Sequence, residues 1–221
     1  MQQRVHFSHK LEELRMLVLR MAALAETAAR NAARAFLETD SDLGEDVIMG
    51  DVDINALEDK IDAFTLEMLA LDQPMACDLR AILGAMRISI NLERVGDEAV
   101  SLAHRAVFLS TRSPLPPNPR MEQLAAHVQD MLAKALRAYA DQDSVLAGQI
   151  CAMDHTADEY SLKVLKESIN TMVEETRIVE RGVHIIMASR ALERIGDLAT
   201  NVAEAVVFIK EGQDIKHKCK G

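Results

Sequence analysis

Apolar residues recur every three or four positions along most of this chain, which is the spacing of one face of an α-helix. Proline interrupts the pattern in the middle of the chain, where four of the five prolines lie within 113–119, because proline cannot continue a helix. Further interruptions follow Thr39 and flank Pro74. We predict helices at about 7–38, 43–71, 75–110, 120–140, 144–173 and 177–211. The pattern therefore predicts an all-α protein.

The two halves of the chain repeat each other. Asp51-x-x-x-Asn55 returns as Asp154-x-x-x-Asp158, and Leu-Glu-Arg-Val-Gly-Asp at 92–97 returns as Leu-Glu-Arg-Ile-Gly-Asp at 192–197. A repeat of this length indicates a duplicated structural unit. We therefore predict two tandem three-helix bundles.

The same repeat sets the expected domain boundaries. The first bundle is predicted at 1–112 and the second at 120–212. A proline-rich linker at 113–119 separates them, and a short basic tail is expected at 213–221.

The last predicted helix of each half carries a heptad seam, which predicts where the core lies. In the first half the seam positions are Ala85, Leu92, Ala99 and Ala106, together with Ile88, Val95, Leu102 and Leu109. In the second half they are Ile185, Leu192, Ala199 and Val206, together with Ala188, Ile195, Val202 and Ile209. Small residues on these seams allow neighbouring helices to approach closely.

Composition narrows the function. Apolar residues make up 49% of the chain but aromatic residues only 3%, and the net charge is −10, so nucleic-acid binding is not expected. The N-terminus has no signal-peptide pattern, and no apolar run is long enough to span a membrane. Three widely spaced cysteines indicate a reducing compartment. We expect a cytoplasmic protein, with at most peripheral membrane contact through the basic tail.

Acidic residues four positions apart lie outside the heptad seams of the last helices. Glu93/Asp97 and Glu193/Asp197 each occupy one helix face, and Asn201 extends the second stripe. The second helix of each half offers another oxygen-rich pair. If these helices are neighbours, the stripes converge, and oxygen ligands suit Mg²⁺, Mn²⁺, Ca²⁺ or iron. The candidate metal ligands are Asp51, Glu93, Asp97, Asp154, Asp158, Glu193, Asp197 and Asn201. A solvated helix surface is the other interpretation of each pair.

These motifs together resemble the PhoU family of phosphate-signalling regulators. The doubled Leu-Glu-Arg-Val/Ile-Gly-Asp motif and Gln73-Pro74-x-Ala76-x-Asp78-Leu79-Arg80 carry the resemblance. It implies a six-helix, two-bundle fold, a homodimer and multinuclear metal clusters, with Mg, Mn, Fe or Zn as candidate metals. It also implies negative regulation of the phosphate-starvation response, between the phosphate ABC transporter ATPase and a sensor histidine kinase. Because Asn55 stands where the family has Asp, the first-half cluster is expected to hold fewer or looser metals.

Two other classes of function remain open at the level of sequence. One is a metal-dependent enzyme that uses the carboxylate clusters, and the other is a metal-free helical interaction protein. The sequence contains no Glu-x-x-His motif, Walker loop or nucleophile motif, so catalysis is the less favoured interpretation. His184 is expected to be a packing residue.

Overall fold

The computed structural model describes residues 2–114 and 116–215, with side chains from residue 7 onward, and the regular structure of these residues is helical. The six long helices are α1 (Gln2–Glu38), α2 (Ser41–Asp72), α3 (Cys77–Ser110), α4 (Pro119–Asp141), α5 (Ser144–Glu174) and α6 (Val179–Glu211). A single 3₁₀ turn, η1 (Thr176–Ile178), precedes α6. The predicted helix count, order and all-α class are confirmed.

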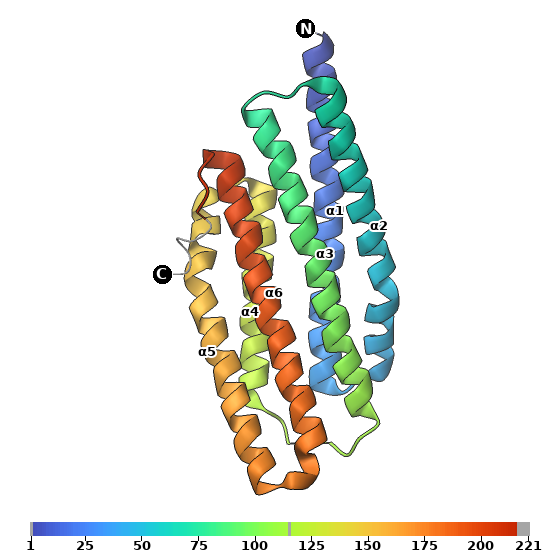
Figure 1. The fold of residues 1–221 in the computed structure, drawn as a ribbon, viewed down its shortest axis with the longest axis vertical. Helices are drawn as coiled ribbons and strands as arrows, with labels where there is room; N and C mark the ends of the chain where they lie inside the picture. The colour runs from blue at the N-terminus through green and yellow to red at the C-terminus, as the bar shows by residue number, and fades with distance from the viewer. Residues whose placement is uncertain (1, 115, 216–221) are drawn as a thin grey trace.

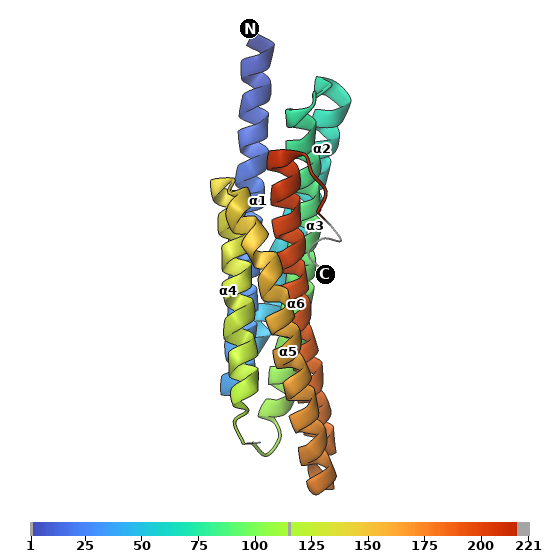
Figure 2. The ribbon, with the colours of Figure 1, turned by 90° about the vertical axis from the view of Figure 1, so that its left-hand side faces the viewer.

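The helices form two three-helix bundles that lie side by side. Helices α1, α2 and α3 pack together, as do α4, α5 and α6, and α3 lies along α6 at the centre of the molecule (Figures 1 and 2). Helix α1 also contacts α4. The two helices that carry the repeated Leu-Glu-Arg-Val/Ile-Gly-Asp motif are thus the two that join the bundles.

Side-chain caps fix the helix starts at equivalent places in both halves. The Asp40 carboxylate accepts a hydrogen bond from the backbone N–H of Leu43 at 3.0 Å. The Asp143 carboxylate accepts from the backbone N–H groups of Val145 and Leu146 at 2.9 and 3.0 Å. A capping side chain satisfies backbone donors that have no partner within the helix. The duplication has therefore preserved the local signal that begins α2 and α5.

The connection between α2 and α3 is longer than the sequence pattern predicts. Gln73 and Ala76 take positive φ angles of 47° and 40°, a conformation that does not fit within a right-handed helix. Helix α3 consequently begins at Cys77, whereas the sequence pattern placed its start at 75.

The predicted seams form the core. Central seam residues of α3 and α6, including Leu92, Ala99, Ile195 and Val202, are buried. Ile185, Leu109 and Ile209, near the helix ends, are partly buried. The core therefore follows the heptad spacing wherever both neighbouring helices cover it.

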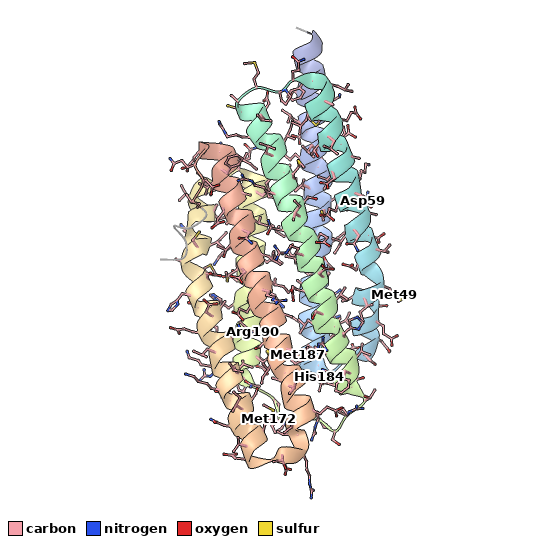
Figure 3. The ribbon with its side chains drawn as sticks, in the orientation of Figure 1. Met49, Asp59, Met172, His184, Met187 and Arg190 are labelled. Atoms are coloured by element: carbon pink, nitrogen blue, oxygen red, sulfur yellow. The ribbon has the colours of Figure 1, made fainter. Side chains whose placement is uncertain are left out.

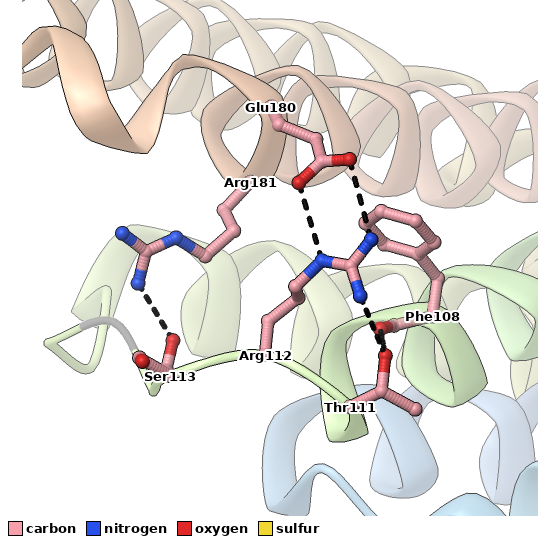
Figure 4. Close-up of polar contacts among 6 residues, drawn as sticks. All are labelled: Phe108, Thr111, Arg112, Ser113, Glu180 and Arg181. Atoms are coloured by element: carbon pink, nitrogen blue, oxygen red, sulfur yellow. Dashed lines mark hydrogen bonds and ion pairs between the residues drawn. The ribbon is translucent and has the colours of Figure 1, made fainter.

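The two bundles are also joined at the end of α3, where polar contacts cross to the start of α6 (Figure 4). The Arg112 guanidinium donates hydrogen bonds to both carboxylate oxygens of Glu180, at 3.2 and 3.3 Å. Arg181 donates to the carbonyl oxygen of Ser113 at 2.7 Å. The Phe108 ring is stacked on the His184 imidazole with 3.7 Å between ring centroids. His184 is a packing residue, as expected.

The chain segment from Thr111 to Asn118 connects the bundles, and Asn118 caps α4 by accepting from the backbone N–H groups of Arg120 and Met121. Of the expected basic tail, residues 216–221 lie outside the described part of the chain. Within the described part, no helix combines the length and the hydropathy that crossing a membrane requires.

Candidate metal centre

Four carboxylates lie within electrostatic range of one another where α2 packs against α3. We call Asp51, Glu58, Glu93 and Asp97 the α2–α3 acidic cluster. Burial raises the pKa of the Glu93 carboxyl, and the negative charges of Asp97, Glu58 and Asp51 raise it further, against a smaller opposing effect of Arg94. Burial also raises the pKa of Glu58, with additional effects of Asp62, Asp59 and Asp97. Neighbouring carboxylates thus add to the effect of burial, and both disfavour the charged forms of Glu58 and Glu93.

The two carboxylate oxygens of Asp51 have different surroundings. Its Oδ2 accepts a hydrogen bond from the Asn55 side-chain amide at 2.9 Å. Its Oδ1 is buried and has no hydrogen-bond partner among the described residues. Burial raises the pKa of this carboxyl, the hydrogen bond from Asn55 lowers it and the charge of Asp97 raises it. A buried carboxylate oxygen without a partner is costly, and a cation would satisfy it.

The second half places uncharged and basic partners beside its acidic residues. The Ser161 hydroxyl donates to Glu193 Oε2 at 3.1 Å, and Arg190 Nη1 donates to the same oxygen at 2.5 Å. The Thr200 hydroxyl lies 3.5 Å from Asp154 Oδ1. The charge of Asp158 contributes to the raised pKa of Arg190, after the larger contribution of Glu193. Arg190 therefore supplies positive charge to a site that the repeat alone predicts to be purely acidic.

Comparison of the halves explains this difference. Arg190 is equivalent to Ile90, and Ser161 is equivalent to Glu58, by the offsets of the repeat. At these two positions the first half therefore has a carboxylate in place of a hydroxyl and an apolar side chain in place of a guanidinium. Sequence reasoning missed Glu58, although its position seven residues after Asp51, on the same helix face, was a signal for it.

Two of the predicted ligands lie in a groove between α3 and α6. Asp197 and Asn201 line this groove together with Arg94, Glu98 and Arg194. The Asn201 amide donates to Asn91 Oδ1 at 3.2 Å, and Arg194 donates to Glu98 Oε1 at 3.0 Å. Both contacts cross from one bundle to the other. Asn201 therefore helps to hold the two bundles together, which its place in the acidic series along α6 did not indicate.

The eight predicted ligands thus fall into three settings. Asp51, Glu93 and Asp97 belong to the α2–α3 acidic cluster, and Asp197 and Asn201 line the groove between the bundles. On α5 and α6, Asp158 and Glu193 lie near Arg190, and Asp154 lies beside Thr200. In the side-chain arrangement of the described residues, no three His, Cys, Asp or Glu side chains gather closely enough to hold a metal ion. Metal binding would require some of these exposed or half-buried side chains to adopt other rotamers.

Comparison with known proteins places this arrangement in a family. The PhoU domain matches the chain twice, at residues 18–106 and 121–206. The chain belongs to the PhoU family. Each match covers the greater part of one bundle, and the proline-rich connection lies between the two.

Relatives of this PhoU-family chain match it over nearly its whole length. The phosphate-specific transport system accessory protein PhoU homolog of Pseudomonas aeruginosa is 37% identical over 212 residues, which are 96% of this chain and 88% of that protein. The homolog of the same name from Aquifex aeolicus is 36% identical over 209 residues, with 95% of each protein covered.

Solved structures agree with the fold. The crystal structure of PhoU from Pseudomonas aeruginosa superposes with a TM-score of 0.90 at 37% identity, covering 94% of this chain and all of that one. The phosphate transport system regulatory protein PhoU from Streptococcus pneumoniae gives a TM-score of 0.88 at 26% identity, covering 95% of this chain and 99% of that one.

Proposed function

We propose that this chain is a cytoplasmic accessory protein of a phosphate transport system that regulates phosphate uptake and represses the phosphate-starvation response. The proposal rests on membership of the PhoU family and on relatives, 37% and 36% identical, that are named as accessory proteins of a phosphate-specific transport system. The match spans both bundles, so it concerns the whole architecture and not one shared domain.

The proposed role is that of an adaptor and not of an enzyme. Its partners would be the transporter ATPase and a sensor histidine kinase, and the working form would be a homodimer. The predicted metal ligands lie along helix faces and in the groove between α3 and α6, where Arg194 pairs with Glu98. Catalysis usually relies on a concave pocket with a positioned nucleophile and base, and this arrangement favours recognition instead.

Metal binding is part of the proposal, and the α2–α3 acidic cluster fits a cation best. It has an unpartnered buried carboxylate oxygen on Asp51. The pKa values of Asp51, Glu58 and Glu93 are raised first by burial and then by neighbouring carboxylates. Asp51, Glu58, Glu93 and Asp97 would hold the ion. A bound divalent or trivalent cation, Mg, Mn, Fe or Zn, would supply positive charge that neutralises the repulsion among these carboxylates and ties α2 to α3.

The second-half residues Asp154, Asp158, Glu193 and Asp197 would bind metal less readily while Arg190 occupies Glu193. We therefore revise the ranking drawn from the sequence, in which Asn55 made the first half the weaker site. Glu58 supplies the additional anionic oxygens that Asn55 lacks.

Deletion of the gene tests the regulatory role. In phosphate-rich medium, a deletion strain should express a phosphate-starvation reporter constitutively, and the intact gene supplied on a plasmid should restore repression. Normal repression in the deletion strain would contradict the proposal. Pull-down with the transporter ATPase and the kinase cytoplasmic region, with and without metal, tests the partners, and sedimentation of the metal-loaded chain tests the dimer.

A further inference from the structure

Helix α2 carries nearly all of the net charge of the protein. Ten acidic residues and one basic residue, Lys60, lie within Ser41–Asp72, whereas the whole chain has a net charge of −10. The equivalent helix of the second half, Ser144–Glu174, has five acidic residues and two lysines. Charge is therefore concentrated on one helix at the outer edge of the first bundle (Figure 1).

The same helix is apolar on two faces. Its inner face buries Val47, Ile54 and Ile61 in the first bundle. Its outer face carries a second series of apolar residues, which we call the outer α2 seam, at alternating spacings of three and four residues. The seam consists of Met49, Val52, Ala56, Ala63, Leu66 and Ala70, all of them exposed.

The large side chains of the outer α2 seam are mostly exposed. Met49 and Val52 are each 67% exposed and Leu66 is 61% exposed. Asp59 completes the heptad spacing between Ala56 and Ala63, and Figure 3 shows Met49 and Asp59 on the edge of α2 that faces away from α3. An a/d series sustained over three heptads is the pattern by which one helix packs against another.

Charge selects the class of partner. Asp53 and Asp59 are exposed on or beside the seam, and Glu67 is exposed beside it but pairs with Lys10 of α1 at 3.5 Å. Within 49–70 the one basic residue is Lys60. A second α2 would bring the same negative charge, and anionic membranes and nucleic acids would also be repelled. A helix with apolar a and d positions and basic flanking positions would meet both the seam and its acidic border, as helices do in helix-in-groove recognition.

The duplication provides an internal comparison. The α5 positions equivalent to Val52, Ala56 and Ala63 hold His155, Glu159 and Lys166. The outer face of α5 is therefore interrupted by charge of both signs, although Leu162 and Ile169 are exposed on it. On α2 this face is interrupted only at Asp59 and bordered mainly by acidic side chains, with Lys60 as the exception, whereas the equivalent face of α5 is interrupted at three positions.

We infer that the outer α2 seam is the docking surface for a basic amphipathic helix of a partner protein. The contact would run along about six turns of α2, or about 30 Å from Met49 to Ala70. The apolar residues would provide most of the affinity, and the acidic border would speed association and reject acidic partners. This surface lies on the other side of α2 from α3, so the inference does not depend on metal binding or on phosphate signalling.

A peptide titration with the full-length protein tests the inference. The probe is a synthetic helix of about 24 residues with Leu at a and d and Lys at e and g, followed by fluorescence anisotropy. The variant Met49→Ser/Leu66→Ser should bind it at least about tenfold more weakly, since two exposed apolar anchors are removed while the charge is unchanged. The matched control Leu162→Ser/Ile169→Ser on α5 should stay within about twofold of the parent protein.

Three results would overturn the inference. The first is equal affinity of the α2 variant, the α5 variant and the parent protein. The second is equally tight binding of a scrambled peptide of the same composition, which would mean that bulk charge alone is recognised. The third is a parent dimer that becomes monomeric in Met49→Ser/Leu66→Ser during sedimentation, which would make a second copy of this chain the occupant.

A photo-crosslinking residue at Val52 extends the test to the cell, with Ile169 as the control position. A crosslink from Val52 to a basic segment with apolar residues every three or four positions in another protein would support the inference. Crosslinks from Val52 only to the same chain or to lipid, or none above the Ile169 control, would refute it.

Discussion

Gly96 of α3 leaves the space into which the Asp51 carboxylate of α2 fits. A Cβ at Gly96 would stand 2.7 Å from Asp51 Oδ1 and 3.1 Å from the Cδ1 of Ile54, both closer than ordinary contact. At the equivalent Gly196 the nearest atom would be Val128 Cγ2 at 3.6 Å, an ordinary contact. The glycine of the repeated motif therefore faces a carboxylate in the first half. In the second half it faces apolar side chains that leave room for a methyl group.

The two glycines should respond differently to alanine. Gly196→Ala should raise the free energy of unfolding by up to about 1 kcal/mol, because alanine favours the helix and nothing must move. Gly96→Ala should be less stable than Gly196→Ala by about 1–2 kcal/mol, because Asp51 Oδ1 and the Ile54 side chain must shift. Urea unfolding of both variants measures this difference. Equal stabilities would show that α2 can shift next to residue 96 without a measurable cost in stability.

Glu58 should lower the stability of the metal-free protein. The pKa of its carboxyl is raised above the unfolded value by burial and by neighbouring acids, so the charged group costs stability that the protonated group does not. This cost grows as the pH rises through the folded pKa. Glu58→Gln should therefore be more stable than the parent at pH 8, by up to about 1 kcal/mol, and the gain should shrink toward pH 4.5. Thermal unfolding in EDTA across this range provides the measurement.

Asp53→Asn serves as the control for Glu58→Gln, since it removes an exposed carboxylate of the same helix outside the α2–α3 acidic cluster. A gain from Asp53→Asn as large as that from Glu58→Gln would attribute the effect to the net charge of α2 and not to the cluster.

Metal content should depend more on the first half than on the second. Glu93→Ala/Asp97→Ala removes two of the four carboxylates of the α2–α3 acidic cluster and should lower metal affinity at least about tenfold, because cation affinity depends on the number of anionic oxygen ligands. Glu193→Ala/Asp197→Ala should have a smaller effect, since Arg190 already pairs with Glu193. Elemental analysis gives the metal content, and circular dichroism should show intact helices in both variants.

The opposite ranking, with most metal lost from Glu193→Ala/Asp197→Ala, would show that Arg190 moves away when metal binds. In that case Arg190→Ala alone should leave the metal content of the protein unchanged. Unchanged metal in both double variants would rule out these pairs as ligands.

Acid should weaken the joint between the bundles at His184. The pKa of His184 is lowered by burial and by Arg105 and Arg112, with Glu180 opposing them. Because the unfolded chain then takes up the proton first, stability is complete above the unfolded value of about 6.5 and is lost as the pH falls below it. His184→Phe keeps a ring against Phe108 but cannot be protonated. Its melting temperature should fall less than that of the parent between pH 7.5 and 5.5.

A variant at another histidine calibrates this result. His155 is exposed and forms an i,i+4 pair with Glu159 on α5, so His155→Phe should leave the parent pH dependence in place. If His184→Phe and the parent lose the same amount on acidification, proton uptake at the joint does not control stability.

The sequence by itself determined the helices and their pairing into two bundles. Apolar spacing, prolines and capping residues such as Asp40 and Asp143 act locally, and the repeat showed that both halves share one plan. The seam through Leu92 and Ile195 predicted the core because heptad periodicity fixes which helix face is turned inward.

Tertiary structure decided what each acidic residue does. Glu58 joins Glu93 only because α2 packs against α3, and Asn201 binds Asn91 only because α6 lies along α3. Arg190 neutralises Glu193 in one half, whereas Ile90 at the equivalent position leaves Glu93 among like charges. The duplicated motif is nearly identical in the two halves, so the difference comes from neighbours across the helix interfaces. Periodicity along one helix cannot identify those neighbours, because it fixes a residue's face and not what packs against it.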